Sequence, residues 1–501
     1  MAKFGELSPK DFYNKFSAGR MDHETTAKNI SELTLPYIMM ADGASSSTQY
    51  KDKIAQAFCG RLINTLKSKM GMSLLPPSTS SFRLEPDKDA LEVITQGNPD
   101  AKAVVYAELS SRTAQINKEI EAQQIRDTIF DMLTQLIVVG SVIMEKKEGK
   151  GIKLHTLRNF TVDLDSRGEP RGLCVVEKLK DLPAGIDFKE KDEYLLYTLL
   201  ERDPVIENWI LRQSIDDTPV GKEITYKDET MPFQYVGWTW TDGDLYHRPY
   251  AEDYLPDMEQ YNQLSDLITK GSIVAAKVIL FVDEKGNRTR KADVARSKNG
   301  AVINGRAEDV TALQLQKNFD FQVPMERLSD IGKNLSSAFL MNESVTRDAE
   351  RVTAQEIRYM AQELEMSSLS GVYSKLAKKV SKRIVEWVMA ELKIKFKGIE
   401  VNVITGLDAL GRSQEGQKLD AYVQRMMTMQ MFSWLDQGEL AQRYASFDGI
   451  DTTGLLKTPT QVQNEQAQAQ AAQAQQMGVE SFAQQAGQTV ATAQQPQQPQ
   501  Q

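Results

Sequence analysis

Apolar residues recur at helical spacing along several long segments of the chain. The clearest stripe takes every fourth residue from Ile54 to Met70. A Pro-Pro pair follows this stripe and ends the predicted helix, because proline cannot continue a helix. A similar apolar face occupies residues 100–139, and Gly140 ends that pattern. The spacing predicts helices over residues 22–33, 50–72, 100–139, 254–277 and 324–341.

Residues 341–365 combine a polar loop with a strong helix start. Thr353 is placed to cap a helix, and Glu356, three residues later, completes a capping box. Apolar residues then continue at helical spacing, which predicts one helix from residue 353 to 395, roughly 60 Å long at about 1.5 Å per residue. A capped helix of this length usually packs against neighbouring subunits or spans a large domain.

Between residues 141 and 240 the hydrophobic pattern changes to a period of two. Short runs such as VIMEK, IKLHTL and GLCVVEKL predict strands, and Asp165-Ser166-Arg167-Gly168 has the composition of a hairpin turn. A smaller β-rich lobe is predicted over residues 278–323, and helices resume beyond it. The pattern therefore predicts an α+β fold in which a sheet region is inserted between helical blocks.

The C-terminal segment, residues 458–501, consists largely of glutamine and alanine. Such low-complexity sequence has too few apolar side chains to bury a core of its own. We expect it to be helical only where a partner or neighbouring subunit supports it. The preceding segment is rich in methionine and aromatic residues, and we interpret it as core or subunit packing, since methionine fills irregular gaps.

Composition sets the broad class of the protein. The length of 501 residues is enough for about three domains, and 41% hydrophobic residues support genuine cores. The two cysteines, Cys59 and Cys174, indicate reduced thiols rather than a disulfide framework. No apolar run reaches the ~20 residues of a membrane span, and the N-terminus lacks the apolar core of a signal peptide. We therefore expect a soluble protein that is not exported.

Sequence motifs for catalysis are missing. His23, His155 and His247 are far from one another and from cysteine in the sequence, and no zinc-ligand spacing is present. Neither a phosphate-binding Gly-x-x-x-x-Gly-Lys-Ser/Thr loop nor a Gly-x-Ser-x-Gly turn occurs. Asp163 and Asp165 alternate on a predicted strand, and a solvated strand face is favoured over a metal site. We predict no enzyme activity, no cofactor, and no catalytic or metal site.

Several segments occur in an informative order. They are RLINTLKSKMGMSLLPPSTSSFRL, DGDLYHRPYAEDYLPDMEQYNQL, SSAFLMNESV followed by RVTAQEIRYMAQELE, and ITGLDALGR. Together they resemble the portal protein (head–tail connector) of short-tailed, podovirus-type bacteriophages, over most of residues 1–457. RVTAQEIRY is the most specific of them. One departure is His247, where the resemblance leads us to expect a glycine between tyrosine and arginine.

The resemblance implies a mainly helical portal fold that assembles as a ring. The implied regions are an N-terminal helical and mixed α/β wing (1–254), a stem helix (255–277), a clip (278–323), a second stem helix (324–341), a channel loop (342–352), a long wing helix (353–400), a helical crown (401–457) and a glutamine-rich tail (458–501).

The same resemblance implies the function and the partners. The ring, a dodecamer in the virion, would conduct double-stranded DNA without sequence preference during packaging into the capsid and ejection from it. It would dock the large subunit of terminase, which is the separate packaging motor, and then the tail adaptor protein. Major capsid, scaffold and internal core proteins are further implied partners. The implied location is the unique capsid vertex of the virion, after synthesis in the bacterial cytoplasm.

The overall charge fits a channel better than a tight DNA-binding protein. The net charge is −9 and the pI is about 5.3. Proteins that hold nucleic acid tightly tend to be basic, because much of their affinity comes from the release of counterions. An acidic surface is therefore suited to a conduit in which DNA must slide.

The implied channel loop contains Arg347 and Arg351 among several acidic residues. Repeated around a ring, the loop would place alternating charges near the pore axis. The arginines could contact phosphates while the carboxylates keep that contact weak. Alternatively, both arginines pair with these acids within or between subunits. Lys333, on the preceding helix, is a further candidate for the channel wall.

Two basic clusters each have two interpretations. Arg288, Arg290 and Lys291 lie in the implied clip, where they serve either solubility or the docking of a partner. The cluster LAKKVSKR, residues 376–383, lies on the predicted long helix. Its favoured interpretation is a solvated or intersubunit face.

A different class of function fits the same sequence pattern. The chain could be a non-ring helical scaffold or an internal virion protein that binds others through its long helix and glutamine-rich tail. A hydrolase with an unrecognised carboxylate site is a third hypothesis. Images of a hollow ring would favour the portal hypothesis over the second, and activity screening with and without divalent metal addresses the third.

Overall fold

The computed structural model describes most of the chain, which divides into two units. Unit 1 comprises Met1–Ser73, Gln124–Thr353 and Gly371–Tyr373, and unit 2 comprises Leu74–Gln123, Ala354–Ser370 and Ser374–Gln501. The described residues are 5–40, 54–76, 80–96, 98–180, 193–275, 279–282, 310–313, 322–341, 354–394, 398–403 and 419–431, with residue 296 and scattered positions between 434 and 469. Among them, no helix is both long and apolar enough to cross a membrane.

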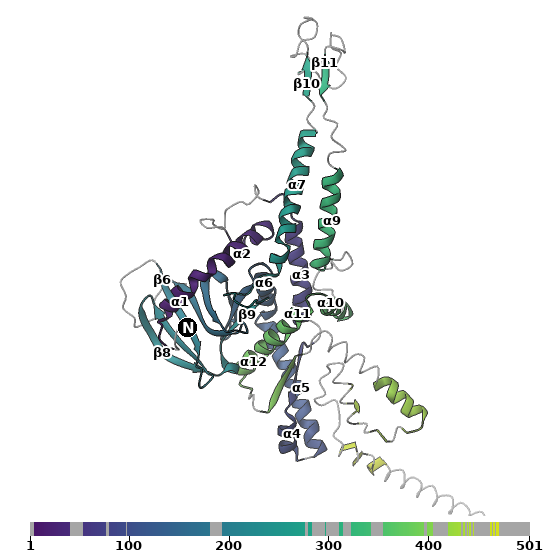
Figure 1. The fold of residues 1–501 in the computed structure, drawn as a ribbon. Helices are drawn as coiled ribbons and strands as arrows, with labels where there is room; N and C mark the ends of the chain where they lie inside the picture. Colours follow the sequence, from purple (N-terminus) through teal and green to yellow (C-terminus); the bar gives the residue numbers. More distant parts are fainter. Residues whose placement is uncertain are drawn as a thin grey trace, which may run out of the picture. The chain divides into compact units, whose positions relative to one another are not determined.

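A five-stranded antiparallel sheet forms one layer of unit 1 (Figure 1). Its strands are adjacent in chain order: β4 Phe160–Leu164, β5 Pro170–Leu179, β6 Tyr194–Arg202, β7 Trp209–Ile215 and β8 Thr218–Tyr226. The turn between β4 and β5 is the one predicted at Asp165. The Asp165 carboxylate accepts hydrogen bonds from the backbone N–H of Arg167 at 2.8 Å and of Glu169 at 2.9 Å. Gly168 adopts a φ of 76°, which glycine does without strain.

Helix α1, Pro9–Ser17, packs on this sheet. Ser8 caps the helix, because its Oγ accepts the backbone N–H of Asp11 at 3.1 Å, and a proline at the first helical position favours the start. Phe12 is the buried anchor of α1 and packs in a cluster with Cys174, Tyr197 and Leu199. A 3-10 turn, Ala18–Arg20, leads directly into α2, Met21–Leu33.

A second, three-stranded sheet lies elsewhere in unit 1. Its order is β3-β2-β9, with β2 Ser141–Lys147, β3 Gly151–His155 and β9 Phe233–Gly237. Helix α6, Ile125–Val138, packs against β2 and β3 through a fully buried apolar face. Gly140, with a φ of 91°, separates α6 from β2, as the pattern predicted. Further 3-10 turns among the described residues of this unit are η2 Leu157–Asn159, η3 Asp228–Thr230 and η4 Tyr250–Tyr254.

His247 occupies a buried position where the resemblance led us to expect glycine. Its side chain is only 2% exposed, and its Nδ1 lies 3.0 Å from the hydroxyl of Tyr235. The ring covers Gly237 so closely that a Cβ atom there would lie 2.1 Å from His247 Cγ. The imidazole of His247 therefore fits because Gly237 of β9 has no side chain.

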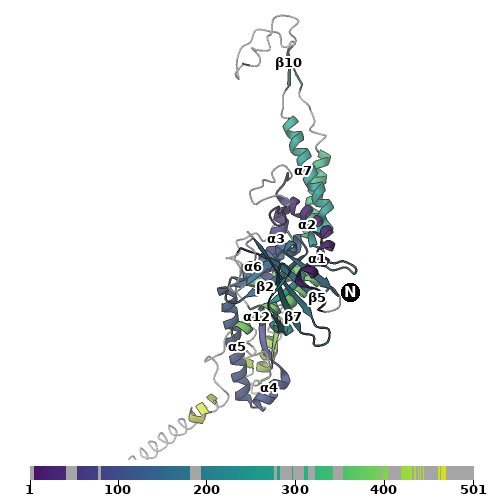
Figure 2. The same ribbon diagram turned by 90° about the vertical axis from the view of Figure 1, so that its left-hand side faces the viewer.

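Helices α7, Leu255–Ala275, and α9, Gln322–Ala338, pack against each other in unit 1 (Figures 1 and 2). Between them in sequence is an antiparallel pair, β10 Ile279–Val282 and β11 Val310–Leu313. The order helix, β pair, helix agrees with the pattern over residues 254–341. Helix α3, Phe58–Leu74, is the shorter observed form of the helix predicted from residue 50.

Unit 2 is built from helices and one small sheet. Strand β1, Phe82–Pro86, pairs antiparallel with β12, Ile399–Val403, and α5, Pro99–Ala122, packs on β1. Helix α4, Lys88–Thr95, precedes α5, and α12, Lys382–Glu391, packs on α5 and β12. Residues 419–428 are also helical. Neither strand of the β1–β12 pair was predicted.

The predicted single helix over residues 353–395 is corrected by the structure. The region is divided into α10 Ala354–Met366, α11 Ser370–Leu376, a π-helical turn Ala377–Ser381 and α12. At the break, Ser367 Oγ donates to the carbonyl of Leu364 at 2.6 Å and accepts the N–H of Leu369 at 3.2 Å. Serine here competes with the helical hydrogen bonds of the backbone. The predicted helix over 100–139 is likewise divided, at Gln124, whose φ is 53°.

Candidate functional site

Helices α3, α7 and α9 line an open groove of about 670 Å³ in unit 1. Phe58 of α3 stacks on Tyr261 of α7 with ring centroids 4.7 Å apart. Gly332 of α9 faces them, and a Cβ atom at this position would lie 3.3 Å from Tyr261 Cε2. The glycine thus allows α9 to approach the stacked rings. The groove is lined by Phe58, Tyr261, Ile268, Met325, Leu328, Ser329, Gly332, Lys333, Ser336, Ser337 and Met341.

The α7–α9 pair also exposes large apolar side chains. Met325 lies in the groove and is 57% exposed. Others on the two helices are Leu267, Ile273 and Val323. Large apolar side chains left exposed together on two packed helices often become buried against a partner. The two helices therefore have the character of an assembly surface.

The C-terminal end of α9 is closely held. Leu340 adopts a left-handed φ of 54°, its N–H bonds to the carbonyl of Ser337, and the N–H of Met341 bonds to the carbonyl of Ser336. This is the Schellman pattern of helix termination. Lys69 of α3, which is 3% exposed, donates from Nζ to the carbonyl of Leu340 at 2.6 Å. The position at which the chain leaves α9 toward residue 342 is therefore fixed by a buried ammonium.

Aromatic rings close the same end of α9. The hydroxyl of Tyr250 donates to the carbonyl of Ala338 at 2.7 Å. The ring of Phe339 lies 5.1 Å from that of Tyr250 and 5.3 Å from that of Tyr254, both in edge-to-face arrangements. These contacts join α9 to η4 and so to the start of α7.

Of the residues predicted to contact DNA or a docking partner, the structure describes Lys333 alone. Its side chain is 76% exposed and its Nζ lies 3.9 Å from Asp330 Oδ1, and the residue lines the groove between α3, α7 and α9. The predicted channel residues Arg347 and Arg351 lie outside the described residues. The same holds for the predicted clip residues, Arg288, Arg290 and Lys291.

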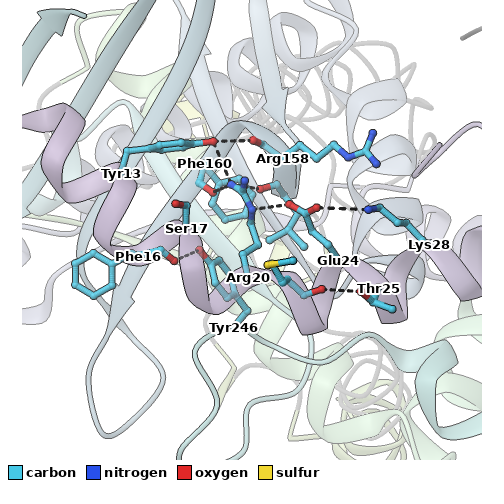
Figure 3. Close-up of polar contacts among 12 residues, drawn as sticks. Tyr13, Phe16, Ser17, Arg20, Glu24, Thr25, Lys28, Arg158, Phe160 and Tyr246 are labelled. Atoms are coloured by element: carbon cyan, nitrogen blue, oxygen red, sulfur yellow. Dashed lines mark hydrogen bonds and ion pairs between the residues drawn. The ribbon is translucent and has the colours of Figure 1, made fainter. Parts of the chain in front are cut away.

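A half-buried arginine joins the N-terminal helices to the rest of unit 1 (Figure 3). Arg20 Nη1 donates to the hydroxyl of Tyr13 at 3.2 Å, the carbonyl of Leu157 at 3.1 Å and the carbonyl of Phe160 at 3.0 Å. Its Nε lies 2.6 Å from Glu24 Oε1. A guanidinium offers several donors in a fixed plane, so one side chain connects α1, α2, η2 and β4. We interpret this cluster as a structural clamp.

Glu145, His155 and Glu177 form a cluster that sequence spacing did not predict. One potential ligand atom of each lies within 4.8 Å of the others, and His155 Nε2 is 2.8 Å from Glu145 Oε2. Lys147 hydrogen-bonds to Glu145, and Lys153 Nζ lies 2.8 Å from Glu177 Oε1. The two lysines already balance the two carboxylates, so a divalent cation would have to displace both. We therefore interpret the cluster as an ion-pair network.

The same network shifts the ionisation of Glu145. Burial opposes its charged form, but hydrogen bonds from His155 and Lys147 outweigh burial and hold the pKa of Glu145 below its ordinary value. The carboxylate is therefore ionised and paired at neutral pH.

The other residues singled out as chemically reactive have structural positions. Asp165 caps the β4–β5 turn, as described above. Cys59 and Cys174 are free and buried, and burial raises the pKa of the Cys59 thiol to about 12. A thiol that remains protonated is a poor nucleophile.

Comparison with known proteins places the chain in a family. Residues 9–456 match the family described as bacteriophage head to tail connecting protein. The portal protein of Enterobacteria phage T3 is 31% identical over 485 residues, covering 92% of this chain and 90% of the relative. The portal protein of Escherichia phage T7 is 30% identical, covering 95% and 92%. The neck of an empty GTA particle is a distant likeness, 10% identical with a TM-score of 0.39, covering 79% and 90%.

The family match extends over both units and includes α3, α7 and α9 as well as α10 to α12. It also includes the segments whose order suggested a connector in the sequence. This protein therefore belongs to the bacteriophage head to tail connecting protein family.

Proposed function

We propose that this chain is a portal protein that closes into a ring, through which double-stranded DNA enters and leaves a phage capsid. The observation that carries the proposal is the family match over residues 9–456, with relatives named portal protein that align along nearly their full length. No catalytic step is part of this role, because the packaging motor is a separate terminase.

The described surface of α7 and α9 supports ring closure. Each subunit carries an apolar groove, and Leu267 and Ile273 are exposed on the same helix pair. Heterologous contacts between identical subunits generate a closed ring when the rotation that relates neighbouring subunits adds up to one full turn. We propose a dodecamer located at the unique vertex of the virion, after synthesis in the bacterial cytoplasm.

The proposed regions follow the order of elements along the chain. Helices α7 and α9 are the stem, and residues 278–323 are the clip that meets the terminase large subunit and then the tail adaptor. The remaining parts form the wing, crown and tail, which contact major capsid, scaffold and internal core proteins. Support for the stem comes from two packed helices that flank a β pair.

The proposed channel wall is formed by Lys333 on α9 and by Arg347 and Arg351 in residues 342–352. The exposed ammonium of Lys333 and the fixed end of α9 support this assignment, since both lie on the path of the chain into that loop. The net charge of −9 supports weak contact with DNA, because each strong phosphate contact would add affinity and slow sliding.

Imaging of the purified protein tests the proposal. Cryo-electron microscopy should show hollow rings, and light scattering should return a mass many times that of one chain. A stable monomer at micromolar concentration, or rods without a pore, would contradict it. Leu267→Glu with Ile273→Glu should prevent ring closure by placing charge in the apolar surface. The matched control is Val205→Glu with Ile206→Glu, which adds the same charge on the exposed turn between β6 and β7.

The clip assignment has its own test. Replacing Arg288, Arg290 and Lys291 together by alanine should leave rings intact while weakening the docking of terminase and tail adaptor. Unchanged packaging and unchanged tail attachment would remove these residues from the docking surface.

A further inference from the structure

A stripe of lysines crosses α11, the π-helical turn and α12 in unit 2. Lys375, Lys378 and Lys382 are all exposed and are spaced by three and four residues, so they share one side of the helical segment. Lys379 and Arg383 are half-buried at its margin. We call these five residues the basic stripe.

Buried apolar residues anchor the helical segment that carries the basic stripe. Leu376, Val380 and Ile384 alternate with the lysines and are at most 1% exposed, so the opposite side of the segment is anchored in the core. The π-helical turn, Ala377–Ser381, lies in the middle of the stripe. Turns of this kind are rare and are frequently found at functional sites.

The local charge of this segment contrasts with that of the whole protein. Residues 371–385 contain five lysines or arginines and no aspartate or glutamate, in a chain whose net charge is −9. The next acidic residue, Glu386, is 7% exposed. It lies 3.2 Å from Arg383 Nη1 and 3.9 Å from Lys382 Nζ. Along residues 371–391 five lysines or arginines thus stand beside two carboxylates, Glu386 and Glu391.

The composition of this surface indicates the class of its ligand. Protein interfaces are anchored by aromatic and other large apolar side chains at their centres. Within residues 371–391, which the structure describes throughout, no large hydrophobic side chain is exposed. A phosphate backbone requires only cations at regular intervals. Lys375 and Lys382 are separated by roughly 10 Å along the helix, or about three phosphate intervals of one DNA strand.

We propose that the basic stripe binds the phosphate backbone of double-stranded DNA, without regard to base sequence. This would be a second DNA-contacting surface, apart from the proposed channel residues Arg347 and Arg351. The proposal rests on the proposed portal function for the presence of DNA beside the protein. The stripe adds a local, salt-sensitive attraction to a subunit whose overall charge repels DNA.

The test is the salt dependence of duplex binding to the purified full-length chain, whether or not it has closed into rings. Fluorescence anisotropy of a short labelled duplex is measured at salt concentrations from about 50 to about 200 mM. The variant Lys375→Gln, Lys378→Gln, Lys382→Gln removes three phosphate contacts. The slope of log K against log salt should then become shallower by about 2.7, which corresponds to roughly 40-fold less change in affinity across this range.

The control variant carries the same change of net charge at three exposed lysines elsewhere, Lys150→Gln, Lys180→Gln and Lys222→Gln. It should keep the wild-type slope. An unchanged slope in the stripe variant, or an equal loss in the control, would overturn the proposal. Binding of polyglutamate with the wild-type salt slope, without binding of the duplex, would also overturn the proposal. The partner of the basic stripe would then be an acidic protein. A wild-type chain that fails to form rings would contradict the portal proposal only, since the salt slope of the stripe is measurable on monomers.

Discussion

The contact between His247 and Gly237 predicts a strong coupling between two substitutions. In Gly237→Ala, the new methyl group would lie 2.1 Å from Cγ and 2.4 Å from both Cδ2 and Nδ1 of the imidazole, where ordinary contacts are 3.4–4 Å. The ring is buried, and its Nδ1 is bonded to the hydroxyl of Tyr235, which in turn lies 3.0 Å from Ser141 Oγ. The imidazole of His247 therefore cannot shift away from the methyl group without breaking its hydrogen bond to Tyr235.

The magnitude follows from the two interactions that must be lost. Overpacking of a core costs about 1–3 kcal/mol, and loss of the hydrogen bond between Tyr235 and His247 costs about 0.5–1.5 kcal/mol. Gly237→Ala should therefore destabilise unit 1 by about 2–4 kcal/mol. His247→Ala should cost a similar amount, because it opens a cavity and removes the same hydrogen bond. Burial raises the pKa of Tyr235 above its ordinary value, so its hydroxyl stays neutral in the assay.

The double variant should be far less damaged than the sum of its parts. The three atoms nearest to the added methyl group all belong to the imidazole ring beyond Cβ, so His247→Ala removes these contacts, and the methyl group added by Gly237→Ala fills part of the vacated space. We expect a coupling free energy of about 2 kcal/mol, within the range for residues in contact.

Differential scanning calorimetry measures this cycle through the unfolding midpoint. At about 2 °C per kcal/mol for a large domain, each single variant should lower the midpoint by about 4–8 °C, and the double variant by about 4 °C less than the sum of the two single changes. Gly371→Ala is the control, because no atom lies within 4 Å of the added methyl group, and it should not lower the midpoint. A double variant that falls by the sum of the two single changes would refute the reasoning.

Three further predictions concern assembly, DNA and acid stability. Arg347→Ala with Arg351→Ala should still form rings but alter DNA filling, or retention of packaged DNA under heat; equal DNA content in both tests would leave the two arginines as structural ion-pair partners. Deletion of residues 458–501 should spare ring closure, because the predicted packing helices precede this segment, and loss of rings by light scattering would contradict that. The folded-state pKa of Glu145 lies below its ordinary value of 4.5, so the stability that Glu145 contributes should be complete above pH 4.5 and decline as the pH falls through the folded-state pKa. In Glu145→Gln the unfolding midpoint should therefore decline less steeply at acid pH. Parallel pH profiles of the midpoint in the two proteins would contradict this prediction.

Local pattern predicted those elements that depend on local sequence. Helix α7 follows from its own periodicity, and the β4–β5 turn follows from Asp165 and Gly168, whose conformations need no distant partner. The pair β1–β12 could not be predicted in this way, because Phe82 aligns with Val403 from a distant part of the chain. The break at Ser367 was missed because apolar spacing continues across it, while the competing hydrogen bonds come from one small side chain.

The candidate sites show the same limit. The hairpin formed by β2 and β3 pairs Glu145 with Lys153, so part of the ion-pair network could be found once that hairpin is placed. Glu177 comes from the five-stranded sheet and has no sequence signal for this role. The contact from Lys69 to Leu340 joins α3 to the residues that follow α9, which are distant in sequence, and a lysine beside an apolar stripe gives no indication of its acceptor.

The short ladder of β10 and β11 has a consequence for engineering. It aligns Ile279 with Leu313 and Val282 with Val310, so the chain enters and leaves the intervening segment at neighbouring points. The entropy of closing a loop rises by only about 0.6 kcal/mol for each doubling of its length. A foreign domain whose own termini lie close together could be spliced between residues 282 and 310 while the ladder continues to pair. Such a fusion would give every copy of the chain one reporter or affinity handle at a known point of its sequence.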